Sequence, residues 1–100
     1  MTGYSILQKV KIFSNNLNNL IFDRDLIVYN PIEYAVDSYS LYLKKYGNGQ
    51  KDILFMGMNP GPWGMAQTGI PFGAIHPVKN FLKIETKIGK PALEHNKRPI

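Results

Sequence analysis

Apolar side chains recur at helical spacing in two stretches of the chain. The first stretch carries Ile6, Val10, Phe13, Leu17, Leu20 and Ile21, with asparagine and lysine between them. This pattern predicts an amphipathic helix over residues 4–20. The second stretch begins at Asn30-Pro31 and ends before Gly47. An asparagine cap, a proline at the first helical position and a glycine stop predict a helix over residues 31–46.

A different pattern follows at residues 52–57, where four apolar residues in a row end at Gly57. A short apolar run bounded by glycine is typical of a strand buried on both faces, as in a parallel sheet. A helix, a buried strand and then a glycine-rich loop form the layout of an α/β fold. Ligands of open α/β sheets bind just beyond the carboxyl ends of the strands. The loop that follows Met56 is therefore the first place to look for a site.

That loop, residues 57–73, holds five of the nine glycines and three of the seven prolines. Its large apolar residues argue against disorder, and a long ordered loop is usually functional. Glycine lets the backbone approach a ligand closely, while proline fixes the path of the chain. We therefore expect a rigid, narrow pocket that presents main-chain N–H and C=O groups.

Two side chains of this loop are candidates for chemistry. Asn59 stands just past the predicted strand, and its amide can accept from a water and donate to a second group. Phe72, between a proline and a glycine, can offer a free ring face for stacking on a nucleobase. Each has a plainer interpretation. Asn-Pro is a common turn pair, and a phenylalanine is often simply a core residue.

Composition narrows the possibilities further. The chain has no cysteine, which excludes disulfides, thiolate zinc sites and cysteine nucleophiles. No apolar stretch approaches the roughly 18 residues of a membrane span. His76 and His95 are far apart in the sequence and lack the partners of a zinc site.

The last quarter of the chain is basic. We expect a short helix that opens at His76-Pro77 and ends near residue 84, with loop beyond it. Residues 76–100 carry six lysines and arginines against two glutamates, and the whole chain has a net charge of +5. A basic stretch near a binding loop favours a polyanion such as DNA, although a solvated lysine-rich face would have the same composition.

Three groups of motifs resemble the single-strand-selective monofunctional uracil-DNA glycosylases. The central group is Gly57-Met58-Asn59-Pro60-Gly61-Pro62, Gly64-Met65-Ala66-Gln67-Thr68-Gly69 and Pro71-Phe72-Gly73. Upstream lie Tyr29-Asn30-Pro31 and Glu33-Tyr34-Ala35, and downstream lie Glu94-His95 and Lys97-Arg98-Pro99. The resemblance covers about residue 20 to residue 100. Trp63 and Ala74 depart from it, because the family is expected to have phenylalanine and often an acidic residue there.

The resemblance implies a role for four residues. Asn59 matches the asparagine that positions the hydrolytic water, and Phe72 matches the aromatic residue that stacks on the flipped-out base. Met58 matches a residue whose main chain contacts the base. Gly61 matches a small residue that leaves room near C5 of the pyrimidine, which fits acceptance of uracil and 5-hydroxymethyluracil.

The resemblance also implies a fold and a partner. We expect an incomplete part of a doubly wound parallel-sheet (α/β/α) domain. Residues 1–25 would form its N-terminal helix and lead-in, and 57–73 its active-site loop. The partner would be single- or double-stranded DNA with a flipped uracil, with no metal, no other cofactor and no membrane. The full enzyme would be a monomer, nuclear in a eukaryote and otherwise cytoplasmic.

The resemblance places two further groups of the family beyond Ile100. They are an asparagine that reads the base edge and a histidine loop that stabilises the departing uracil. The 100 residues are therefore expected to have little glycosylase activity alone. Two alternatives stay open: a non-catalytic nucleic-acid-binding fragment and a generic α/β interaction domain.

Overall fold

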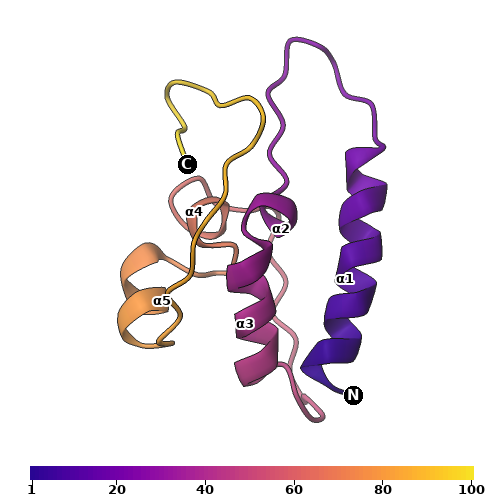
Figure 1. Ribbon diagram of the computed structural model, residues 1–100, viewed down its shortest axis with the longest axis vertical. Helices are drawn as coiled ribbons and strands as arrows, with labels where there is room; N and C mark the ends of the chain where they lie inside the picture. The colour runs from indigo at the N-terminus through magenta and orange to yellow at the C-terminus, as the bar shows by residue number, and fades with distance from the viewer.

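The computed structural model describes residues 1–100 and is built from helices and long connections (Figure 1). The helices are α1 (Gly3–Asn18), α2 (Pro31–Tyr34), α3 (Val36–Tyr46), α4 (Met65–Thr68) and α5 (Ile75–Asn80). The chain has no β-sheet, and its one β-bridge joins His95 to Arg98. No helix has both the length and the apolar character needed to span a membrane.

The helix predicted at 4–20 is confirmed as α1, which packs against α3 (Figure 1). Thr2 begins it through a capping box, because its hydroxyl accepts from the Ser5 N–H at 3.0 Å and the Ser5 hydroxyl accepts from the Thr2 N–H at 3.2 Å. A glycine is required at position 3: a Cβ built there would lie 2.1 Å from the carbonyl oxygen of Leu43. The start of α1 is therefore fitted closely to the end of α3.

The prediction of a single helix at residues 31–46 is wrong in one respect. The structure interrupts the helix at Ala35. The Tyr34 carbonyl accepts from the Gly89 N–H at 2.8 Å, and Gly69 packs directly on Ala35. Tertiary contacts thus turn the backbone out of the helix.

Asn30 does not cap either helix. Its side-chain amide instead donates to the Ser14 hydroxyl at 3.1 Å. The predicted end before Gly47 is confirmed.

The prediction of a buried strand at residues 52–57 is also wrong. The segment carries no ladder hydrogen bonds, and its apolar side chains are exposed, from 73% at Ile53 to 84% at Met56. A parallel strand exists only when neighbouring strands supply partners for its N–H and C=O groups. Nothing else in residues 1–100 forms such a strand, so the α/β sheet expected from the sequence is absent from this part of the fold.

The core is small and lies between α3, α4 and α5. Its centre is formed by Ile70, Val78 and Ile84, with Leu41, Tyr42 and Leu82 packed around them. The accessible surface is 7680 Å². A compact monomeric domain of this mass exposes only about 5,800 Å². The excess comes from apolar stretches such as 52–58 and 20–28, which the core does not cover.

The helix predicted to open at His76-Pro77 is confirmed, with bounds slightly different from those expected. It begins at Ile75 and ends at Asn80 rather than near residue 84. Val78 faces the core, while the exposed Phe81 follows the last turn. Beyond it, the chain runs past α4 to the C-terminus without regular structure (Figure 1).

Candidate functional site

The middle of the glycine-rich loop is ordered by α4, an element that the sequence did not predict. Gly61 opens it, because its carbonyl accepts the N–H groups of Gly64 at 3.2 Å and Ala66 at 3.0 Å. Gly69 closes it with φ at 76°, a left-handed conformation that favours glycine. The Tyr34 hydroxyl donates to the Ala66 carbonyl, which fastens α4 to α2. The 61–69 part of the loop is therefore a rigid scaffold.

Tyr34 is held in its protonated form by this arrangement. Burial, together with smaller contributions from the nearby Tyr29 and Glu94, raises its pKa from 10.0 to about 12. Desolvation disfavours the phenolate, so the hydroxyl remains a donor at neutral pH. The hydroxyl therefore still donates to the Ala66 carbonyl at alkaline pH values where an ordinary tyrosine is ionised.

Asn59 lies at the wall of a cavity of about 830 Å³. Its side chain is exposed, and none of the hydrogen bonds of the chain involves its amide. Pro60 and Pro62 lie on the same wall, and residues 25–29 form another. The volume is within the usual range of ligand pockets. The plainer interpretation, in which Asn59 serves only to cap its own turn, has no hydrogen bond to support it.

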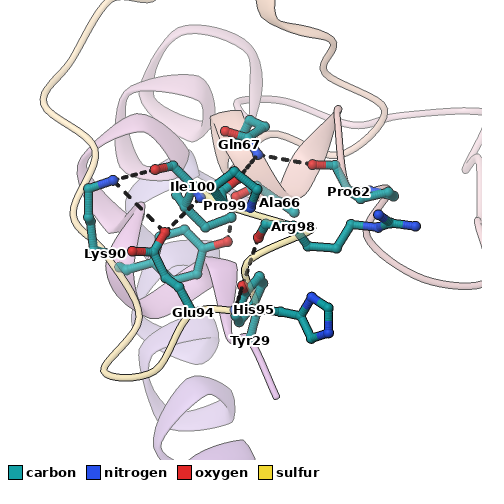
Figure 2. A network of polar contacts seen from close by, with 11 residues as sticks. Tyr29, Pro62, Ala66, Gln67, Lys90, Glu94, His95, Arg98, Pro99 and Ile100 are labelled. Atoms are coloured by element: carbon teal, nitrogen blue, oxygen red, sulfur yellow. Dashed lines mark hydrogen bonds and ion pairs between the residues drawn. The ribbon is translucent and has the colours of Figure 1, made fainter. Parts of the chain in front are cut away.

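The third wall of this cavity comes from the C-terminal part of the chain. His95 and Arg98 close a tight turn, in which the Arg98 N–H donates to the His95 carbonyl at 2.9 Å. The Tyr29 hydroxyl accepts from the His95 N–H and donates to the Arg98 carbonyl, both at 2.7 Å. Figure 2 shows this hydroxyl between the two arms of the turn. Tyr29 thus holds residues 95–98 against the cavity.

Gln67 makes the second connection between α4 and the C-terminal segment. Its side-chain amide donates to the Pro62 carbonyl at 3.1 Å and to the Pro99 carbonyl at 2.6 Å (Figure 2). One side chain therefore joins the Asn59 side of the loop to the residues that follow Arg98. Glu94 supports the same segment by accepting from the Ile100 N–H at 2.7 Å.

Phe72 lies in a turn whose geometry normally calls for glycine. The Gly73 N–H donates to the Ile70 carbonyl at 2.8 Å, and Pro71 occupies the second position. Phe72, at the third position, has φ at 59°. In type II turns this position requires positive φ, which costs an L-residue about 1–2 kcal/mol. Strain of this kind is found preferentially at functional sites.

Phe72 is 70% exposed and does not belong to the core. A Cβ built on Gly57 would lie 3.3 Å from two ring carbons, so one part of the ring rests over Gly57. The turn itself is braced by Thr68, whose hydroxyl donates to the Gly73 carbonyl at 2.7 Å. The interpretation of Phe72 as a buried core residue is therefore wrong.

Only one of the four predicted site residues lines the large cavity. Asn59 lines the 830 Å³ cavity, whereas Met58, Gly61 and Phe72 do not. Met58 is 96% exposed, and the side of Gly61 where a Cβ would stand is open, with the nearest atom 4.0 Å away. A second cavity of about 310 Å³ is lined by residues of α4, α5 and the segment 84–90, and includes none of the four.

Known proteins resemble this chain over most of its length, although no protein-family model matches it. A curated Bos taurus protein named single-strand selective monofunctional uracil DNA glycosylase is 44% identical over 95 residues, which are 94% of this chain and 35% of that protein. Proteins of the same name from Rattus norvegicus and Mus musculus are 47% and 46% identical over 74 residues, 74% of this chain. These residues are 27% and 26% of the two rodent proteins.

This chain is homologous to part of the single-strand selective monofunctional uracil-DNA glycosylases. It spans about a third or less of the length of the curated relatives that it matches. The three motif groups that resemble these glycosylases are neighbours in space. Tyr29 contacts the 95–98 turn, Tyr34 contacts Ala66, and Gln67 contacts Pro99. The glycosylase motifs are therefore joined by hydrogen bonds between side chains and backbone.

Reasoning from local sequence missed Tyr29, Tyr34 and Gln67 as residues that build the site. Each lay inside a glycosylase motif, but their partners are 32 to 69 positions away in the chain. Periodicity cannot report contacts at such separations. The only sequence signal for these contacts was that the motifs containing the three residues occur together in one family.

Proposed function

We propose that this chain is the part of a monofunctional uracil-DNA glycosylase that supplies the water side of the active site. The whole enzyme would hydrolyse the N-glycosidic bond of uracil and of 5-hydroxymethyluracil-type bases in single- and double-stranded DNA. The observation that carries the proposal is the 44% identity to the Bos taurus glycosylase over 94% of the chain. No metal or other cofactor enters the reaction.

In this proposal Asn59 positions the attacking water. Hydrolysis builds positive charge at C1′ of the sugar and negative charge on the departing base. An amide oxygen can orient a water toward C1′, but it cannot accept the proton as an effective base. The support for this role is that the Asn59 amide is exposed at a cavity and is free of other hydrogen bonds.

Phe72, Met58 and Gly61 are proposed to contact the flipped base. An exposed ring held over Gly57 offers a face for stacking, which commonly contributes about 1–3 kcal/mol per base. The Met58 main chain would contact the base edge. The open space beside Gly61 would accommodate a substituent at C5 of the pyrimidine.

These 100 residues alone are expected to show little or no excision. The groups that read the base edge and stabilise the uracil anion are proposed to lie in a segment homologous to later parts of the relatives. Loss of one such stabilising group commonly lowers the rate by about 100- to 1000-fold. The enzyme is further proposed to act as a monomer in the nucleus, since the matching relatives are mammalian.

A chimera tests the proposal. The matching segment of the Bos taurus glycosylase is replaced by this chain, and excision is measured on a uracil-containing oligonucleotide. The chimera is expected to release uracil and 5-hydroxymethyluracil, whereas the 100-residue chain alone is not. A folded chimera without activity would overturn the proposal. It would favour the second candidate, a non-catalytic nucleic-acid-binding fragment, which the net charge of +5 supports.

A further inference from the structure

The cavity that contains Asn59 has two free cations on its rim. Lys97 and Arg98 both line it, both are exposed, and neither takes part in an ion pair. One guanidinium nitrogen of Arg98 donates to the Lys97 carbonyl at 2.8 Å, which leaves its other donors available. In Figure 2 the Arg98 side chain extends toward Pro62, on the same wall as Asn59.

The backbone beneath these cations is stiff. The Lys97 N–H donates to Nδ1 of His95 at 3.0 Å, in addition to the bond that closes the turn. The Tyr29 hydroxyl bridges both arms of the turn. Two cations on a braced turn lose less entropy on binding an anion than two cations on a loose chain.

We propose that the turn at residues 95–98 binds a backbone phosphate of the DNA strand and so sets its position relative to Asn59. Arginine presents a planar fork that matches two phosphate oxygens, and lysine adds a compact charge. Phosphate contacts fix the register of a nucleic acid without reading its sequence. This inference rests on the proposed function, since it names the anion as a phosphodiester of DNA.

One group on the cavity opposes the phosphate. Asp25 is a further charged residue in the lining, and it forms no ion pair with Lys97 or Arg98. The rim still carries one net positive charge when His95 is neutral. Asp25→Asn removes the repulsion and is expected to tighten binding.

Binding of the 100-residue chain to a fluorescent single-stranded oligonucleotide without uracil tests the inference. Anisotropy is recorded over a range of salt concentrations. The Lys97→Gln/Arg98→Gln variant is expected to bind more weakly. Its slope of log K against log salt should be shallower by about 0.7, because one lost phosphate contact on a single strand contributes about 0.7.

A matched variant supplies the control. Lys9→Gln/Lys11→Gln removes the same charge from the exposed surface of α1, away from the cavity. It is expected to leave the slope near that of the unmodified chain. Equal losses in the two variants, or an unchanged slope in the Lys97/Arg98 variant, would overturn the inference. Since the oligonucleotide carries no uracil, this result stands apart from the excision assay of the chimera.

Discussion

Replacing Phe72 with glycine and with alanine separates the cost of its backbone conformation from the contacts of its ring. At 70% exposure the residue buries roughly 60 Å², which corresponds to about 1.5 kcal/mol. Both variants lose this contribution. Only alanine retains the cost of φ at 59°, about 1–2 kcal/mol. Glycine gains freedom in the unfolded chain, which offsets about 0.4–1 kcal/mol.

The Phe72→Gly variant is therefore expected to be more stable than Phe72→Ala by about 0.5–1 kcal/mol. For a domain of this size that difference is several degrees in Tm, since 1 kcal/mol shifts it by about 4–8 °C. The assay is thermal and urea unfolding followed by circular dichroism at low protein concentration. The wild-type chain is expected to equal or exceed both variants.

Phe81 provides a matched control for this comparison. It is also an exposed phenylalanine, at 81%, but its φ is −98°, in the right-handed region. At negative φ a glycine variant is ordinarily less stable than an alanine variant. Phe81→Gly is therefore expected to be less stable than Phe81→Ala by about 0.5 kcal/mol. If Phe72→Gly were as unstable as Phe72→Ala or more so, the account of a glycine-type turn occupied by an aromatic residue would be refuted.

Three further predictions concern the site and its surroundings. Tyr29→Phe removes two hydrogen bonds to the 95–98 turn and is expected to cost about 1 kcal/mol and to speed amide exchange at His95; unchanged exchange would contradict it. Because the pKa of Tyr34 is raised to about 12, its contribution to stability is complete below pH 10 and is lost as the pH rises toward 12. Urea titrations above pH 10 should thus show a steeper loss for the wild type than for Tyr34→Phe, and parallel curves would rule this out. The exposed apolar side chains of residues 53–58 are expected to promote self-association. Leu54→Lys with Met56→Lys, at positions that are 83% and 84% exposed, is expected to reduce it in light scattering without lowering Tm; persistent association would argue against this segment as its cause.

The sequence predicted α1, the start of α2 and the end of α3 because their causes are local. A periodic apolar stripe, a proline at a first turn and a glycine after Tyr46 act within a few residues of one another. The break at Ala35 depends on Gly69 and Gly89, which are far away in the chain. The strand at 52–57 has the right composition, but strand formation also requires neighbours that residues 1–100 do not supply.

In the candidate site, too, local features could be predicted from the sequence and long-range contacts could not. Asn59 and Phe72 were found from local chemistry and from the resemblance to a family, and both side chains are exposed. Their roles remain predictions. The residues that hold the site together escaped local reasoning because a side-chain hydroxyl such as that of Tyr29 meets backbone groups more than 60 positions later. The left-handed backbone of Phe72 was likewise invisible, since nothing in a proline-phenylalanine-glycine run fixes the sign of φ.

Uracil release by the chimera with Asn59→Ala tests the central claim most directly. The account predicts a rate at least about 100-fold below that of the unmodified chimera, because the attacking water is no longer oriented. Asn16→Ala, a change on the exposed surface of α1, is expected to leave the rate unchanged. Equal rates in the Asn59 and Asn16 variants, with both proteins folded, would contradict a role for Asn59 in placing the water.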